Sequence, residues 1–345
     1  AERFKAFLEA FRPDVIHCHG IAHQLTYSIL SVARRFNIPV VQTLHDYQPI
    51  CPNYTLLKGD QSICGEGEGC TPHNYLPCVQ NRCVKGSLAA SLLSAAEMAY
   101  NRSWFDYSRL VDQFVSPSRF LADQVVARGL PAQRVMQIPN FLVGLEQYPA
   151  ATGNGEYFLY IGRLSYEKGL MTLLKAFAQV PDARLLIVGD GPLKAELTGF
   201  CERNGMSNVR FEGHVDRDGV SRLVQGSLAV ILPSEWYENQ PMSIIEAFAH
   251  ARPVIASRIG GIPEMVSDGC GFLFPPGDAE ALAALVRQAI VQLEKMVDLG
   301  RQARQIAMNT YHSDIHMAHL TRLYASIMAS SPQVRDASVT IPSLF

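Results

Sequence analysis

At 345 residues, with 48% apolar and 18% charged side chains, the chain has the composition of a soluble globular protein and exceeds what one hydrophobic core usually serves. The formal net charge of −2 gives no reason to expect nucleic acid as a partner. No apolar run reaches the roughly 18 residues of a membrane span, and no signal-peptide pattern opens the sequence. We therefore expect two domains and a cytoplasmic location. A slight excess of Lys and Arg before residue 140 is compatible with peripheral contact at the inner face of a membrane, and is too small to predict it.

Strand and helix patterns alternate along most of the chain, and this order predicts parallel α/β sheets. The stretch 142–155 is rich in Gly, Ala and Pro and has no periodicity, so we place a linker there. We expect a first domain at 1–145, a second at 156–311, and a helix at 312–330 that crosses back to the first. Strands are predicted at 14–20, 39–47, the start of 111–130, 133–140, 157–163, 183–191, 209–215, 228–234, 253–257 and 271–274. Helices are predicted at 1–14, 24–38, 85–110, the rest of 111–130, 169–180, 192–205, 218–226, 243–251, 262–269 and 279–296.

An irregular insertion rich in Cys, Gly, Pro and Asn interrupts the first domain at 51–83. Loops of this length are usually functional or held by cross-links. Without a secretion signal, reduced thiols or metal ligands are favoured over disulfides, and four thiolates could hold a structural zinc ion. The spacing is looser than C-x2-C, so buried free thiols or a disulfide formed on oxidation stay as alternatives. The candidate zinc ligands are Cys64, Cys70, Cys78 and Cys83.

Two cations follow the predicted strand at 157–163 and precede a helix. Gly162 and Arg163 end the strand, and Lys168 comes five residues later. The planar fork of Arg, the compact charge of Lys and the free amides of a helix N-terminus together suit a diphosphate. Two surface cations on a loop are the ordinary alternative. Their place on the same sheet edge as Glu238 favours the diphosphate site.

The stretch 228–257 joins an apolar strand, an acidic loop, an amphipathic helix and a second strand. Glu238 lies in the loop and Glu246 on the first turn of the helix, with seven residues between them. Open α/β sheets hold phosphorylated ligands at such a loop, outside the carboxyl end of a strand and before a helix N-terminus. Ser243 and Glu246 also fit a helix-capping box, which would give Glu246 a surface role. A carboxylate at the same place could instead accept two ribose hydroxyls.

Taken in order, these motifs resemble the retaining glycosyltransferases of family 4. The resemblance covers nearly all of residues 13–330 and rests on GRLSYEKGL, GDGP, VRFEGHV, the two glutamates, AFAHARPVIAS and GGIPEMVSDGCGFLFPPGD. It implies a GT-B architecture, in which two Rossmann-like domains with doubly wound parallel sheets face each other across a cleft. The opening strand and glycine-rich loop of the family would precede Ala1, so the resemblance also implies a truncated first domain.

For the sugar donor, the resemblance implies that Arg163 and Lys168 hold the diphosphate beside Glu238, which would face the transferred sugar. Glu246 would bind the ribose, and the backbone around Val215 would meet the base. Backbone amides after Glu238 would meet sugar hydroxyls. The donor-binding set is completed by Gly162, Gly189, Asp190, Gly191, Asn239, Gln240, Met242 and Ser243.

For the acceptor, the resemblance implies that His19 contacts the sugar or lies on the acceptor side. We therefore include His19 among the predicted catalytic residues, with Glu238, Arg163 and Lys168. His45 and Asp46 would form a wall of the acceptor cleft. A His at a strand end is more often structural than catalytic, so the resemblance alone favours these roles. The acceptor could be a sugar, a lipid-linked molecule or a small molecule.

Three other features carry weaker signals. Gly189-Asp190-Gly191 could let the backbone approach a ligand, and an ordinary tight turn explains it equally well. Asp216-Arg217-Asp218 has the form of a metal-binding D-x-D pair, but an Asp between a strand and a helix is an ordinary helix start. Pro241 departs from the family pattern because it has no N–H to donate.

These features predict an enzyme that moves a hexose-type unit from a UDP- or GDP-sugar to an acceptor hydroxyl with retention of anomeric configuration. The product would belong to polysaccharide, glycolipid or other cell-envelope glycoconjugate synthesis. Fixed cations and helix-end amides would stabilise the leaving diphosphate, so no catalytic cofactor is expected. The alternatives are a hydrolase or epimerase acting on a nucleotide sugar, and a non-catalytic nucleotide-binding protein with a metal-held cysteine loop. The oligomeric state is not predicted.

Overall fold

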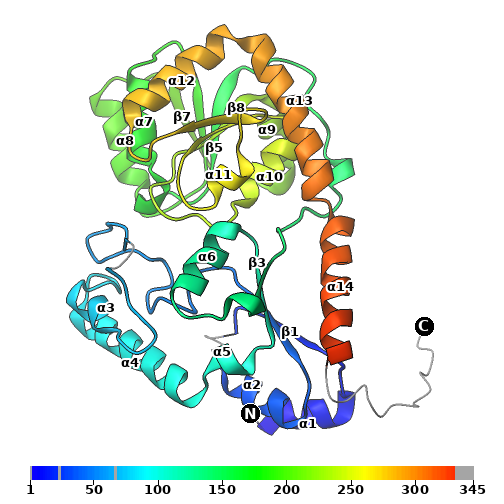
Figure 1. The fold of residues 1–345 in the computed structure, drawn as a ribbon. Coiled ribbons are helices and arrows are strands. Elements are labelled where there is room, and N and C mark those ends of the chain that lie inside the picture. Colours follow the sequence, from blue (N-terminus) through cyan, green and yellow to red (C-terminus); the bar gives the residue numbers. More distant parts are fainter. Residues whose placement is uncertain (1, 22–24, 66–67, 331–345) are drawn as a thin grey trace.

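The computed structural model describes residues 2–21, 25–65 and 68–330, which form two α/β domains (Figure 1). The first domain has a four-stranded sheet in the order β1-β2-β3-β4, and the second has a six-stranded sheet in the order β10-β9-β8-β5-β6-β7. Every strand pair in both sheets is parallel. The prediction of two Rossmann-like parallel-sheet domains is therefore confirmed.

The first domain has short strands and helices of very unequal length. The predicted helix at 85–110 is two helices, because Phe105 and Asp106 leave helical geometry. The strands are β1 (Ile16–His19), β2 (Val40–Thr43), β3 (Gln113–Ser116) and β4 (Val135–Gln137). The helices are α1 (Glu2–Phe11), α2 (Ser28–Arg35), α3 (Leu76–Gln80), α4 (Leu88–Trp104), α5 (Tyr107–Leu110), α6 (Arg119–Ala127) and the 3-10 turn η1 (Ala132–Arg134).

In the second domain β5 and β8 lie side by side at the centre of the sheet. The loops that follow these two strands therefore leave the same edge next to each other. The strands are β5 (Tyr157–Ile161), β6 (Leu185–Val188), β7 (Val209–Gly213), β8 (Ser227–Leu232), β9 (Val254–Ser257) and β10 (Gly271–Phe274). The helices are α7 (Leu170–Ala178), α8 (Lys194–Arg203), α9 (Arg217–Gly226), α10 (Met242–Ala249), α11 (Ile262–Met265), α12 (Ala279–Val291) and α13 (Leu293–Thr310), with 3-10 turns η2 (Leu145–Gln147) and η3 (Tyr166–Lys168).

The core of the second domain lies on both faces of its sheet. All six residues of β8 and all four of β9 are buried, as expected of parallel strands covered by helices on both sides. Alternate residues of β5 serve opposite faces: Phe158 packs with Phe177 of α7, and Leu159 packs with Phe248 of α10. The sheet edge that carries the site is thus held in place by apolar clusters on both faces of the sheet.

The last described helix, α14 (Ser313–Ser330), leaves the second domain and runs along the first (Figure 1). Its Leu320 and Leu323 pack against Val41 of β2. Tyr324 also meets the first sheet, because its hydroxyl lies 2.5 Å from Nδ1 of His17, whose Nε2 lies 2.7 Å from Oγ1 of Thr43. The chain is therefore tied back to the first domain by apolar packing and by a half-buried histidine.

His17 is expected to make stability pH-dependent. Burial lowers its pKa to about 4, and nearby His19, His316 and His45 lower it as well. The unfolded chain would take up a proton near pH 6.5, whereas the folded chain would not until about pH 4. The free energy of unfolding should therefore fall as the pH drops through this window.

Denaturant unfolding from pH 7.5 to 4.5 measures the effect. The slope for His17→Gln should be smaller than the wild-type slope by up to about one proton bound on unfolding. His73→Gln is a suitable control, because His73 is exposed and lies outside this cluster. Equal slopes in wild type and His17→Gln would contradict a neutral, buried His17.

Candidate functional site

The loop after β8 holds a buried carboxylate in a direct ion pair. Glu238 is only 6% exposed, and its Oε1 accepts hydrogen bonds from Nζ of Lys168 and from Oγ of Ser234, each at 2.7 Å. Lys168, at the end of η3, also lies 5.0 Å from the ring centroid of Trp236. The structure thus joins the residue predicted to face the sugar with a residue predicted to hold the diphosphate. Each charge offsets the desolvation of the other.

Arg163 stands on the loop after β5 that also carries Lys168. Its backbone carbonyl accepts a hydrogen bond from the Tyr160 hydroxyl at 2.9 Å, which fixes the start of the loop. The side chain is exposed, and within the described part of the chain its guanidinium has no ion-pair partner. Arg163 is therefore available to an anion in a way that Lys168, already paired, is not.

The glycines near this loop serve packing between two backbones. Gly189 has a φ of 134°, and a Cβ there would lie 2.0 Å from the carbonyl oxygen of Gly162. A Cβ on Gly191 would lie 2.4 Å from the carbonyl oxygen of Leu164. Asp190 between them accepts a hydrogen bond from the Gly191 amide at 2.7 Å. The close approach that these glycines permit is to the neighbouring loop, and a donor-binding role for Gly162, Gly189, Asp190 and Gly191 stays a prediction.

The residues after Glu238 bridge the two domains. Oδ1 of Asn239 accepts from Oγ of Ser118 at 2.6 Å, and its Nδ2 donates to the carbonyl of His45 at 3.4 Å. Oε1 of Gln240 accepts from the backbone amide of Asn140 at 2.6 Å. These side chains are engaged with the first domain, and a contact between this segment and the donor stays a prediction.

Glu264 of α11 is a functional candidate that the sequence reasoning missed. Its two carboxylate oxygens accept hydrogen bonds from the amides of Arg119 and Phe120 at 2.7 and 2.6 Å. A carboxylate from the second domain thus caps the N-terminus of α6 in the first. Gly261 allows a close approach beside it, since a Cβ there would lie 1.9 Å from the carbonyl oxygen of Asn239 and 3.0 Å from the Cβ of Ser118 in the first domain. The only sequence signal was the GGIPE string, which gives no partner.

The two predicted acceptor-side histidines lie together at the ends of β1 and β2. Nδ1 of His19 is 2.9 Å from Nε2 of His45, and both side chains are exposed. Although both residues are exposed overall, partial burial of each ring lowers its pKa, and His45 further lowers that of His19. Neutral rings suit this contact, because one nitrogen must donate and the other accept. Asp46 accepts from the Gln48 amide at 2.9 Å and shapes the turn that follows.

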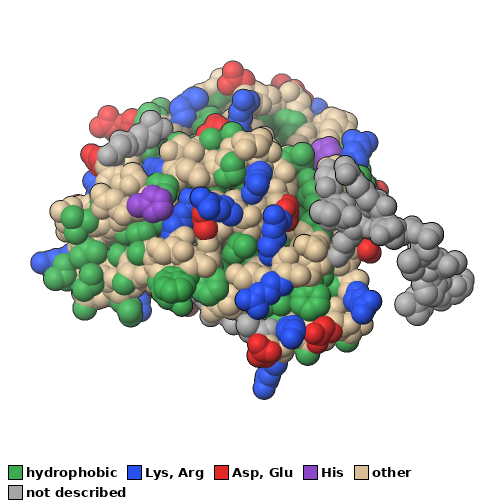
Figure 2. Space-filling view, turned by 60° about the horizontal axis from the view of Figure 1, so that its bottom comes forward, with side chains coloured by type: hydrophobic (Ala, Val, Ile, Leu, Met, Phe, Trp, Pro, Cys, Tyr) green, Lys and Arg blue, Asp and Glu red, His purple; other side chains and the backbone are tan. Residues whose placement is uncertain are grey.

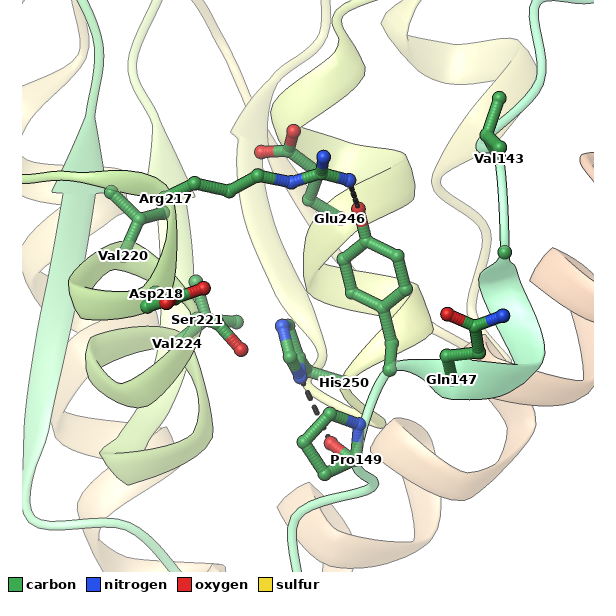
Figure 3. A pocket seen from close by; sticks show the side chains of 12 residues that line it. Val143, Gln147, Pro149, Arg217, Asp218, Val220, Ser221, Val224, Glu246 and His250 are labelled. Atoms are coloured by element: carbon green, nitrogen blue, oxygen red, sulfur yellow. Dashed lines mark hydrogen bonds between the residues drawn. The ribbon is translucent and has the colours of Figure 1, made fainter.

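Glu246 lines a cavity of about 330 Å³ between α9, α10 and the segment 143–149 (Figure 3). Arg217 of α9 extends across the carboxylate and donates to the Tyr148 hydroxyl at 2.7 Å (Figure 3). Burial raises the pKa of Glu246, and the Arg217 charge acts in the opposite direction. Glu238 does not line this cavity, so the two glutamates face different spaces.

The capping-box interpretation of Ser243 and Glu246 is wrong. Helix α10 begins at Met242, one residue before Ser243, and Pro241 at its N-cap makes no side-chain cap. Glu246 is therefore half-buried on the cavity side, not folded back over the helix end. The other predicted cap is present: Oδ1 of Asp216 accepts from the Gly219 amide at 2.8 Å and begins α9. Val215, before this cap, is partly buried against the second-domain core, and its contact with a base stays a prediction.

Comparisons with known proteins identify both halves of the chain. Residues 147–306 match the family described as glycosyl transferases group 1, and residues 1–140 match the glycosyl transferase 4-like domain. Neither match alone covers half of the chain, and together they span most of it. The first match lies in the second domain of the fold and the second match lies in the first domain, with the boundary at the linker between the sheets.

Individual relatives are distant. The chain is 26% identical over 309 residues to a sulfoquinovosyl transferase of Arabidopsis thaliana, covering 86% of this chain and 53% of that protein. It is 30% identical over 197 residues to a phosphatidyl-myo-inositol mannosyltransferase of Mycobacterium leprae, covering 53% and 50%. The crystal structure of Anabaena HepE in complex with UDP matches with a TM-score of 0.71 at 20% identity, covering 94% and 82%. The chain thus spans about half the length of these two curated relatives, and the structural likeness shows the fold.

The cysteine-rich insertion of the first domain brings its thiols together. Five cysteines line one small cavity, the four predicted zinc ligands and also Cys51. All eight cysteines of the chain are free thiols. Within the described ranges, no group of three or more His, Cys, Asp or Glu side chains is arranged to hold a metal ion. The structure gathers the thiols, and the structural zinc stays a prediction.

Metal analysis of protein purified with a reductant and without chelators tests the zinc prediction. If the zinc prediction is right, the protein should hold about one zinc per chain, and Cys78→Ser should lose it because a structural site needs four ligands. Cys201→Ser should retain the metal, since Cys201 is buried in α8 of the other domain. Zinc-free wild type, with thiols that titrate as reduced, would refute the prediction.

Proposed function

We propose that the chain is a glycosyltransferase that moves a sugar from a nucleoside-diphosphate sugar to an acceptor hydroxyl. The observation that carries the proposal is the ion pair of Lys168 and Glu238 beside exposed Arg163, on the sheet edge that faces the other domain. A buried carboxylate and two cations on adjacent loops match the two parts of such a donor, a neutral sugar and an anionic diphosphate. The two glycosyltransferase domains support the same function.

The donor would place its diphosphate at Arg163 and Lys168 and its ribose at Glu246. Glu246 suits the ribose, because a half-buried carboxylate can accept two hydroxyl protons. The guanidinium of Arg217 lies near this carboxylate. On donor binding it would either contact the nucleoside or move out of the cavity. UDP is favoured as the nucleotide, since Anabaena HepE is described in complex with UDP, and GDP is the alternative.

Transfer would proceed with retention of anomeric configuration and without a metal. As the bond from the anomeric carbon to the phosphate oxygen breaks, its electron pair goes to the diphosphate, and Arg163 and Lys168 stabilise that charge. The acceptor hydroxyl would attack from the leaving-group side and give its proton to the departing phosphate oxygen. Glu238, held by Lys168 and Ser234, would lie beside the sugar and stabilise the positive charge that develops at the anomeric carbon. We do not propose a double displacement, because that mechanism would need a second carboxylate about 5 Å from Glu238.

The acceptor would be met by the first domain, with His19 and His45 in its wall. We propose a lipid-linked or saccharide acceptor in cell-envelope glycoconjugate synthesis at the cytoplasmic side of a membrane. The similarity to a mannosyltransferase named for phosphatidyl-myo-inositol supports a lipid acceptor.

A panel of UDP- and GDP-sugars distinguishes the candidate functions. A transferase attaches the sugar to an added acceptor, a hydrolase releases free sugar, and an epimerase returns an altered nucleotide sugar. The anomeric proton coupling of the product, measured by NMR, tests retention. Nucleotide binding without turnover across the panel would leave only the non-catalytic alternative.

Arg163→Ala is expected to lower kcat by on the order of 10²-fold, the usual effect of deleting one group that stabilises transition-state charge. Lys168→Ala should lower kcat similarly and should also destabilise the fold, because Glu238 would stay buried without its cation. Arg210→Ala is the matched control, since Arg210 is an exposed cation on β7 that pairs with Glu212. Wild-type turnover in both Arg163→Ala and Lys168→Ala would refute the diphosphate site.

Glu246→Gln is expected to weaken nucleotide binding by about tenfold or more, since a hydrogen bond to a charged group contributes about 1.5–3 kcal/mol. Calorimetric titration with UDP and with GDP measures the change. Glu280→Gln, an exposed glutamate of α12, should bind as the wild type does. If Glu246→Gln kept full affinity for both nucleotides, the ribose role would be wrong.

A further inference from the structure

Helix α4 turns its large apolar side chains away from the protein. Its buried positions are the small residues Ser91 and Ala95, which face the rest of the domain. Its outer face carries five large apolar side chains, two of them, Leu93 and Trp104, more than 70% exposed. The others are Leu88, Leu92 and Tyr100. A helix that packed only within this chain would bury these residues and expose the small ones.

The outer face of α4 is flanked by cations at both ends. Arg82 and Lys85 precede the helix, and both are exposed. Arg109 follows it, and its side chain is 85% exposed although it pairs with Asp106 at 3.2 Å. Within the helix, Glu97 and Arg102 are the charged residues. Figure 2, which brings the lower side of Figure 1 forward, shows hydrophobic side chains gathered at the left, over α3 and α4, with Lys and Arg side chains farther along the same face.

We propose that this α4 surface, made of Leu88, Leu92, Leu93, Tyr100 and Trp104 with Arg82, Lys85 and Arg109 at its ends, docks on an anionic phospholipid bilayer. A helix with an apolar face and flanking cations lies in the plane of a membrane interface, with the apolar side chains among the upper acyl chains and the cations at the headgroups. Tyr and Trp, here at one end of the helix, favour the headgroup level. None of the described helices is long and apolar enough to cross a membrane.

The charge distribution favours a bilayer over a second copy of the chain. In a two-fold dimer through α4, parallel packing would bring Lys85 against Lys85, and antiparallel packing would bring it against Arg109. Either arrangement places like charges together, which costs free energy. Anionic headgroups complement both ends at once. The surface also belongs to the domain in which we place the acceptor, but its binding to lipid does not depend on the proposed activity.

Sedimentation of the chain with vesicles tests the proposal. We compare vesicles of pure phosphatidylcholine with vesicles containing phosphatidylglycerol, at low and at physiological salt. The wild type should bind the anionic vesicles, and binding should weaken with salt because the cations contribute. The emission of Trp104 should shift to shorter wavelength on binding, and Trp104→Phe separates it from Trp236.

The double variant Leu92→Glu/Leu93→Glu should bind anionic vesicles at least about tenfold more weakly. Both side chains are exposed, so the fold should survive, and circular dichroism and calorimetric binding of UDP check this independently of lipid. Val291→Glu is the matched control, because Val291 is an exposed apolar residue on α12 of the other domain.

Two results would overturn the proposal. The first is vesicle binding that is absent, or equal in the wild type and the double variant. The second is a wild-type dimer that the double variant disrupts, measured by light scattering, which would make a second copy the occupant. Loss of UDP binding with intact vesicle binding would count against the proposed function and leave this inference standing.

Discussion

The ion pair of Lys168 and Glu238 depends on one feature of topology, the adjacency of β5 and β8 in the second sheet. These strands are separated by some 70 residues of chain, yet their loops leave the same edge side by side. Glu238 can remain buried because the partly exposed Lys168 offsets the desolvation of its charge. The rest of the site is arranged around this pair, with Arg163 on one loop and the bridging residues Asn239 and Gln240 on the other.

The same loop also sets the relation between the domains. Asn239 and Gln240 bond to the first domain directly, and Glu264 caps α6 from the second domain. Helix α14 adds an apolar contact on the far side of the linker. The two domains are thus joined in two places. Polar contacts hold them together near the site, and the apolar packing of α14 holds them together away from it.

The sequence was sufficient for the fold because alternating apolar runs and helical patterns are local signals. It also placed Lys168 and Glu238 on one edge, since the carboxyl ends of parallel strands meet there. Residues whose roles depend on a distant partner could not be found in this way: Glu264 acts on α6, and His17 meets Tyr324 some 300 residues later. The capping box failed for a local reason, because α10 starts at Met242, with Pro241 at the N-cap position that the box would give to Ser243.

If a diphosphate binds as proposed, Lys168 would lie between that anion and Glu238. Its ammonium now satisfies Glu238, and a diphosphate at the same loop would compete for the same charge. Arg163, exposed and without an ion-pair partner in the described residues, can supply the first contact at little cost, and Lys168 can then be shared. Any shift of Glu238 during this exchange moves the loop that holds Asn239 and Gln240. We infer that the occupancy of the diphosphate site and the contact between the domains are coupled through these few residues.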